Sequence, residues 1–274
     1  MYALSVSLPP SRLDRINQAA YRRRAVLRQF ATASGWLEPG EQAAVTSVAA
    51  EARGAPILDI GIGGGRTAPL MRAISEDYCG IDYIPAMVAV AHNRFPDADF
   101  REMDARHLTF PDTKFALVTF SYNGIDSVDV PGRRLVLADV YRVLRPAGCF
   151  VFSTLNRDSM ATLAHWPDWQ VFHGAGLQPD RLFRATARLV FGGINHLRGL
   201  ALARDDGEVA VANLSAHNFA LVTVFTSLKA QIRELQGVGF TLEAIFTPDA
   251  ECVPPDDHAD SAAPWHHFVV RKRG

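Results

Sequence analysis

The chain has 274 residues, 48% of them hydrophobic, which is enough for a sizeable core in one large domain or in one domain that carries an insertion. Its 28 Lys and Arg residues nearly balance its 29 Asp and Glu residues, and the formal charge of −1 excludes a global field that would attract nucleic acid or an anionic membrane. No apolar stretch approaches the roughly 20 residues that cross a bilayer, no secretory signal is visible, and three widely spaced Cys residues fit reduced thiols, so we expect a cytoplasmic protein without a membrane or nucleic-acid partner.

The N-terminal part of the chain predicts helices. Residues 11–36 carry apolar side chains at roughly the spacing of an amphipathic helix, with Ser11 as its cap. A second helix is expected over residues 39–53, because a proline opens this stretch and a glycine follows it. We therefore assign residues 1–54 to an N-terminal helical segment.

Between residues 55 and 155 short β-rich runs alternate with helical ones, and the same rhythm returns over residues 226–274. Such alternation predicts an α/β fold, a three-layer sandwich in which helices cover both faces of a mostly parallel sheet. Residues 156–225 break the rhythm, and their "LALARDDGEVAV" indicates a hairpin around Asp206 and Gly207. This stretch is too long for an ordinary loop, so we predict an inserted cap.

The glycine-rich turn "DIGIGGGR" follows the first predicted strand, and such turns serve nicotinamide cofactors, nucleotides and sulfonium cofactors. The dinucleotide fingerprint G-x-G-x-x-G starts at Gly61 but fails at Arg66, where its third glycine belongs. The stretch instead spells D-x-G-x-G-x-G from Asp59 onward. Gly61 and Gly63 allow the backbone to approach a ligand, and a helix that begins near Gly64 would direct free N–H groups toward a carboxylate.

Asp82 ends the second predicted strand, about 20 residues after Gly61, which is the span from glycine turn to acid in nucleotide-binding βαβ units. A carboxylate at this position can accept hydrogen bonds from both hydroxyls of a ribose. The same span suits a nicotinamide enzyme, so Asp82 predicts a nucleoside site rather than one particular cofactor. Tyr83 and Met87, which follow it, can cover an adenine face.

Two further stretches complete a pattern, "FREMDARHL" at 100–108 and "VYRVLRPAGCFVFSTLN" at 140–156. Together with the D-x-G-x-G-x-G turn and Asp82, they resemble the class I S-adenosylmethionine-dependent methyltransferases, over about 57–155 and 227–272. The resemblance implies S-adenosylmethionine as the cofactor and S-adenosylhomocysteine as the product. It also implies a seven-stranded sheet whose last strand is antiparallel.

The resemblance assigns individual residues as well. Asp104 would bind the adenine amino group, the Ala105 amide would bind a ring nitrogen, and Asp59 would accept from the ammonium group, directly or through water. Residues 1–54 would fold over the cofactor as a lid. The complete set of cofactor-binding residues that we expect is Asp59, Ile60, Gly61, Gly63, Gly65, Arg66, Asp82, Tyr83, Met87, Asp104, Ala105, Ser121 and Tyr122.

A sulfonium is already an activated methyl donor, so alignment, worth roughly 7 to 11 kcal/mol, matters more than a general base, which adds about 10² to 10⁴ in rate. The catalytic candidates are Tyr122 and Asn123, which follow the fourth strand, and His173 in the cap as a base for a hydroxyl. Relatives that act on nucleic acids or protein glutamine carry Asn/Asp-Pro-Pro-aromatic after that strand, and "SYNG" departs from it. Candidate substrate contacts are the aromatic residues Tyr21, Trp36, Trp166 and Trp169.

These observations predict transfer of a methyl group to an oxygen or nitrogen of a small molecule, such as a specialised metabolite, in a pocket between the lid and the cap. The spacing of His and Cys residues predicts no metal site. Two alternatives stay open, an NAD(P)-dependent oxidoreductase on a similar sheet and an S-adenosylmethionine-binding protein without transfer activity. A homodimer is a further hypothesis.

Overall fold

The computed structural model describes residues 10–33, 35–164, 178–254 and 261–274. Its first three described helices are α1 (Arg12–Tyr21), α2 (Arg24–Thr32) and α3 (Pro39–Ala52). The stretch 11–36 was expected to form one helix, but the chain turns at Arg22 and the extended Arg23. The break has a packing reason, because α1 can then lie against the inserted segment while α2 lies against a helix of the main sheet.

The main sheet of the described chain has seven strands in the order β3-β2-β1-β4-β5-β10-β9. Every neighbouring pair is parallel except those of β10, which runs antiparallel to both β5 and β9, so the predicted architecture is confirmed. The crossover in strand order between β1 and β4 creates a switch point where open α/β sheets bind ligands. The strands are β1 (Ile57–Ile60), β2 (Tyr78–Asp82), β3 (Asp99–Glu102), β4 (Phe115–Phe120), β5 (Leu144–Leu155), β9 (Phe240–Phe246) and β10 (Trp265–Lys272).

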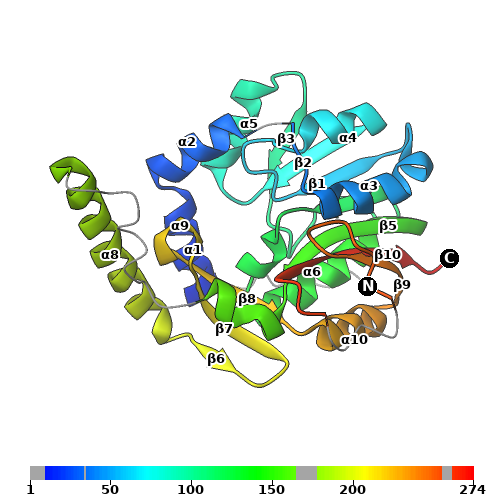
Figure 1. Cartoon of the computed structure of the whole chain (residues 1–274). Coiled ribbons are helices and arrows are strands. Elements are labelled where there is room, and N and C mark those ends of the chain that lie inside the picture. Colours follow the sequence, from blue (N-terminus) through cyan, green and yellow to red (C-terminus); the bar gives the residue numbers. More distant parts are fainter. Residues whose placement is uncertain (1–9, 34, 165–177, 255–260) are drawn as a thin grey trace.

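Helices cover both faces of this sheet, which gives the predicted three layers (Figure 1). One apolar core lies between the sheet and α3, α4 and α5, and the other lies between the sheet and α6 and α10. Each fully buried Val, Leu or Met side chain in these cores contributes roughly 1.5–3 kcal/mol. The helices not yet located are α4 (Ala68–Ile74), α5 (Pro85–Arg94), α6 (Val130–Val143) and α10 (Leu228–Val238).

An insertion between β5 and α10 carries a small sheet of its own. Its described part contains η2 (Arg157–Ser159), α7 (Met160–Leu163), α8 (Pro179–Leu200), β6 (Arg204–Asp205), β7 (Val209–Leu214), α9 (Ala216–Phe219) and β8 (Leu221–Thr226). Strands β6 and β7 form the predicted hairpin, in which the Asp206 carboxylate accepts from the amides of Glu208 and Val209. Helix α8 reaches away from the main sheet, on the left of Figure 1. None of the described helices is long and apolar enough to cross a membrane.

A buried asparagine joins the N-terminal helices to the insertion. Strand β8 lies at the edge of the small sheet, so its outer N–H and C=O groups need partners from elsewhere. The Asn17 side chain of α1 accepts from the Val222 amide at 2.9 Å and donates to the Val222 carbonyl at 2.8 Å. It also donates to the carbonyl of Ser127 at 3.2 Å, in the short helix η1 (Gly124–Ser127) that follows β4. Asn17 thereby fixes α1 beside the cavity described next, which Asp14 and Tyr21 of this helix line.

Candidate functional site

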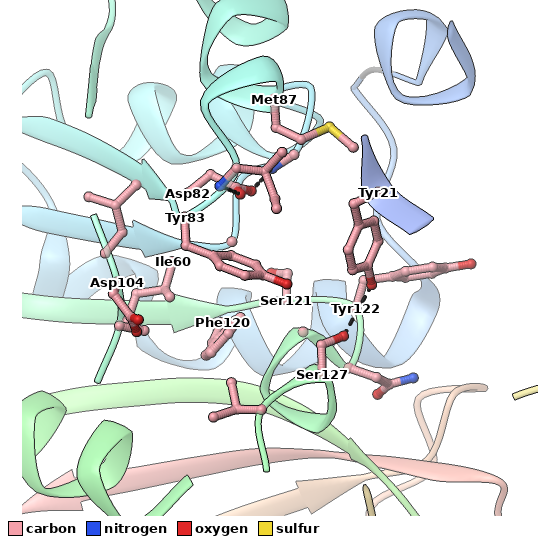
Figure 2. Close-up of a pocket in the computed structure, with 18 of the residues that line it drawn as sticks. Tyr21, Ile60, Asp82, Tyr83, Met87, Asp104, Phe120, Ser121, Tyr122 and Ser127 are labelled. Carbon is pink, nitrogen blue, oxygen red and sulfur yellow. Dashed lines mark hydrogen bonds between the residues drawn. The ribbon is translucent and has the colours of Figure 1, made fainter. Parts of the chain in front are cut away.

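A cavity lies at the carboxyl ends of β1, β2 and β4, and Figure 2 shows the side chains that surround it. Three parts of the chain enclose this cavity. The ends of the central strands form its floor, the N-terminal helices contribute Asp14, Tyr21 and Phe30, and the insertion contributes Leu214, Leu221 and Thr223. The N-terminal helices and the inserted sheet therefore meet at the carboxyl edge of the main sheet, where a ligand would be enclosed.

The glycine-rich turn forms one wall of the cavity, and close approaches explain its composition. Gly61 has a φ of +67°, and a Cβ there would lie 2.7 Å from the Phe120 ring. At Gly64 a Cβ would lie 2.1 Å from the carbonyl oxygen of Phe30 in α2. The expected helix start near Gly64 is wrong, because α4 begins at Ala68 and the intervening residues form turns. Close packing of α2 thus requires glycine here, in addition to any requirement of a ligand.

Asp82 lies at the floor of the cavity, at the end of β2. Its carboxylate accepts from the amides of Gly63 and Ile84, each at 2.9 Å, which joins the acid to the glycine turn. Burial raises the pKa of Asp82 to about 6, although these amide hydrogen bonds favour the charged form. A ligand that donated hydrogen bonds to this carboxylate would offset the loss of hydration.

Asp104 also lines the cavity, beyond the end of β3, and an arginine links it to α1. Arg106 donates to Asp104 at 2.6 Å and to Asp14 of α1 at 2.7 Å. Burial opposes ionisation of Asp104, but the hydrogen bonds and the charge of Arg106 hold its pKa below the ordinary value. A charged acid is therefore available at the place where the family resemblance implies the adenine amino group.

Asp59 differs from the other two acids because it does not line the cavity. It is buried under the glycine turn and accepts from three hydroxyls, those of Thr67 at 2.5 Å, Thr119 at 2.8 Å and Tyr78 at 3.1 Å. Burial raises its pKa, against the effect of the three hydroxyl hydrogen bonds. Its observed contacts fix the turn to β4 and β2, and direct contact with a cofactor ammonium group has no support in this arrangement.

Two other residues of the expected cofactor set, Gly65 and Arg66, are also absent from the lining among the described residues. Arg66 makes a two-pronged pair with Glu41 of α3, with both distances 2.8 Å. Its guanidinium carbon lies 4.6 Å from the centre of the Trp36 ring and 5.3 Å from the centre of the Tyr122 ring. Trp36, an expected substrate contact, therefore packs in this outer cluster rather than on the cavity.

The end of β4 places two candidate catalytic residues on the cavity. Tyr122 and Asn123 have φ values of +53° and +58°, a region that side chains other than glycine adopt at a cost of about 1–3 kcal/mol. The Asn123 amide donates to Ser153 Oγ of β5 at 2.7 Å, which helps to fix this turn. The turn directs both residues to the lining, beside Ser121.

The structure brings together most of the expected site and adds residues that no motif indicated. Tyr21 lines the cavity, and its hydroxyl lies 3.1 Å from Ser127 Oγ (Figure 2). His173, Trp166 and Trp169 lie outside the described residues. The expected residues found on the lining are Tyr21, Ile60, Gly61, Gly63, Asp82, Tyr83, Met87, Asp104, Ala105, Ser121, Tyr122 and Asn123. Those missed in the sequence include Phe30, Ser127, Leu155 and Thr223.

Comparison with known proteins identifies a domain within the chain. A family model described as a methyltransferase domain matches residues 57–148. A probable S-adenosylmethionine-dependent methyltransferase from Mycolicibacterium smegmatis is 32% identical over 104 residues, which are 38% of this chain and 39% of that protein. A demethylmenaquinone methyltransferase from Renibacterium salmoninarum is 32% identical over 103 residues, which are 38% of this chain and 42% of that protein. The matches thus span about two fifths of the length of these relatives.

A solved structure extends the likeness of fold to the whole chain. The 1,6-didemethyltoxoflavin-N1-methyltransferase of Burkholderia thailandensis, with bound 1,6-didemethyltoxoflavin and S-adenosylhomocysteine, has a TM-score of 0.57 at 13% identity. The comparison covers 100% of this chain and 93% of that one. The matched domain holds the glycine turn, Asp82 and Asp104, and the sheet has the seven strands and the antiparallel last strand that the resemblance implied. Residues 57–148 therefore match a methyltransferase domain, and the fold of the chain is similar to that of a solved methyltransferase.

Proposed function

We propose that the protein transfers the methyl group of S-adenosylmethionine to an oxygen or nitrogen of a small molecule. One observation carries the proposal. The same cavity is lined by Asp82, Asp104 and the glycine turn of the cofactor motifs, and also by side chains of the N-terminal helices and of the inserted sheet. Such a cavity offers adjoining places for a cofactor and a second molecule.

The residues of the cofactor side fit a sulfonium nucleoside. In this proposal Asp82 accepts hydrogen bonds from the ribose hydroxyls, Asp104 and the Ala105 amide bind the adenine, and Tyr83 and Met87 cover its face. S-adenosylmethionine, when bound, supplies a methyl group that needs no further activation. The backbone around Gly61 and Gly63 borders the cavity and leaves room for the amino-acid part.

The task of the protein is then to hold the methyl acceptor in line and to exclude water. Correct alignment is worth roughly 7 to 11 kcal/mol of the barrier. Tyr122 and Asn123 lie at the carboxyl end of β4 and would border the reacting atoms. In this proposal the N-terminal helices act as the lid, since Tyr21 and Phe30 are among the residues that line the cavity.

The known relatives support a small-molecule acceptor. The Burkholderia protein is a 1,6-didemethyltoxoflavin methyltransferase and the Renibacterium protein is a demethylmenaquinone methyltransferase, and both of these acceptors are small molecules. The departure of "SYNG" from the Asn/Asp-Pro-Pro-aromatic pattern argues in the same direction. The proposal also includes a specialised metabolite as the methyl acceptor and a homodimer as the oligomeric state.

The test is a screen for turnover. The purified protein is incubated with S-adenosylmethionine and a library of small phenols, alcohols and amines, and both S-adenosylhomocysteine and methylated products are followed by mass spectrometry. We expect production of S-adenosylhomocysteine that depends on one chemical class of acceptor. Tight cofactor binding without turnover across the library would favour the non-catalytic alternative, and binding of NADH instead would favour the oxidoreductase.

A further inference from the structure

Three of the residues that line the cavity each carry a buried polar side-chain atom that lacks a hydrogen-bond partner within the described part of the chain. These atoms are Tyr83 Oη, Asn123 Oδ1 and Thr223 Oγ1. A buried polar atom without a partner costs about 1–3 kcal/mol. Such atoms therefore point to a ligand that completes their hydrogen bonds, and Figure 2 shows the Tyr83 ring extending toward Ser121 across the cavity.

Thr223 is the most informative of the three because of its place in the fold. It lies on β8 of the inserted sheet, away from every cofactor motif, and only 3% of its surface is exposed. Leu221 on the same strand, Leu214 on β7 and Leu155 on β5 line the cavity with it. A polar atom in an apolar wall is the arrangement that orients a largely apolar ligand.

The charged residues of the described lining lie outside the wall that β5, β7 and β8 form. They are Asp14, Asp82, Asp104 and Arg106, which come from the lid and from the ends of β2 and β3. Arg106, the cation among them, already pairs with two of these acids. None of the described lining residues from β5, β7 or β8 is charged, so this wall offers nothing to neutralise a carboxylate or a phosphate.

We propose that Thr223 and Asn123 form the polar contacts of a methyl-acceptor subsite for a neutral molecule that carries an O–H or N–H group on an apolar body. Asn123 Oδ1 can only accept a hydrogen bond, so the ligand must donate one. The Thr223 hydroxyl can accept or donate, and it fixes the orientation of the ligand against Leu155 and Leu221. This inference rests on the proposed function, because it assigns the acceptor side of that same site.

The first experiment measures binding to the protein saturated with S-adenosylhomocysteine. The probes are 2-naphthol, 2-naphthoate and 2-naphthyl phosphate, which share one ring system and differ in the polar group. We expect calorimetry to show binding of 2-naphthol, with the two anions at least tenfold weaker. Anions that bind as tightly as 2-naphthol would overturn the proposal, and so would a failure of 2-naphthol to bind up to its solubility limit.

The second experiment changes the hydroxyl itself. Thr223→Val keeps the shape of the side chain and should weaken 2-naphthol binding at least fivefold, with no change in S-adenosylhomocysteine affinity. Because the lost hydroxyl had no partner, the Tm should stay level or rise. Thr226→Val is the matched control, since Thr226 lies buried on the same strand but does not line the cavity.

Each outcome of this pair of variants is decisive. Wild-type affinity for 2-naphthol in Thr223→Val, or an equal loss in Thr226→Val, would overturn the subsite. If the unmodified protein did not bind S-adenosylhomocysteine, the proposed function itself would be overturned. This result would be seen before any probe is added.

Discussion

Asp82 is the side chain on which cofactor binding should depend most. Its carboxylate lines the cavity and already organises the glycine turn through the Gly63 amide. We expect Asp82→Ala to weaken S-adenosylhomocysteine binding at least tenfold, about 1.4 kcal/mol, while circular dichroism shows an intact fold. Asp97→Ala is the control, because Asp97 is exposed and distant from the lining. Unchanged affinity in Asp82→Ala would show that Asp82 is not the ribose acid.

The raised pKa of Asp82 gives a prediction for pH. Its value of about 6 means that the carboxyl becomes protonated as the pH falls through 6, and a protonated acid accepts fewer hydrogen bonds from a ribose. Affinity for S-adenosylhomocysteine should therefore be constant above pH 7 and should fall toward a limit of about tenfold per pH unit below 6. Asp104 stays ionised over this range because its pKa is lowered.

Titrations at half-unit steps from pH 5 to pH 8 would test this dependence. The described lining contains no histidine that could titrate in its place. The Asp82→Ala variant should show a flat profile over the same interval. An identical slope in the variant would assign the pH dependence to another group.

Among individual residues, the sequence allowed us to place on the site mainly those that directly follow a predicted strand. Asp82 and Asp104 could be placed because each follows a β-rich run, and the ends of parallel strands meet at one edge. Asp59 satisfied the same motif but lies among the hydroxyls of Thr67, Tyr78 and Thr119. No spacing rule brings these three hydroxyls together, because they come from different elements.

The attachment of α1 to the inserted sheet depends on one side chain. Asn17 is fully buried and satisfies the edge of β8 in the manner of a neighbouring strand. Its replacement in Asn17→Ala leaves buried backbone groups without partners, at about 1–3 kcal/mol each. We expect urea denaturation to show a loss of that order in the free energy of unfolding, and the exposed Arg15→Ala on the same helix to show almost none.

A loss in Asn17→Ala no larger than that in Arg15→Ala would mean that α1 is held chiefly by its apolar face. That face includes Leu13, which packs with Val222 and Val224 of β8. The two contributions can be separated because Asn17 contacts the strand edge, whereas Leu13 contacts apolar side chains.

Among helices and strands, the hydrophobic pattern predicts the elements of the regular α/β alternation. It does not predict features that depend on tertiary packing. The alternation of β-rich and helical runs identified the central strands and α10. This helix is terminated by Gly239, whose backbone adopts the left-handed conformation that favours glycine. The break between α1 and α2 at Arg22 and Arg23 could not be predicted from the sequence, because the two helices diverge to contact different neighbours. The place of Thr223 on the cavity lining could not be predicted either, because it depends on how β8 packs against the main sheet.

The whole molecule contains a buried ion pair that connects four of its elements. Arg133 of α6 pairs with Asp126 of η1 and donates to Thr154 of β5 at 3.3 Å and to Gln231 of α10 at 2.6 Å. Removal of one partner of a buried pair leaves a charge without compensation and costs about 3–5 kcal/mol. We expect that loss in Arg133→Met.

The adjacent Arg134 provides the matched control. Its side chain is largely exposed, and its pair with Glu234 is long, at 3.9 Å. Arg134→Met should therefore change the free energy of unfolding by less than about 1 kcal/mol. Similar losses in the two variants would show that the buried pair does not stabilise the fold more than a surface pair does.

The central claim is that this cavity binds a sulfonium nucleoside, and calorimetric titration tests it most directly. The purified protein, freed of any carried-over cofactor, is titrated separately with S-adenosylmethionine, S-adenosylhomocysteine and NADH. We expect micromolar binding of both sulfur nucleosides and none of NADH, because the fingerprint for dinucleotides fails at Arg66, which pairs with Glu41 instead. Binding of NADH without either sulfur nucleoside would contradict the account and assign the glycine turn to a nicotinamide cofactor.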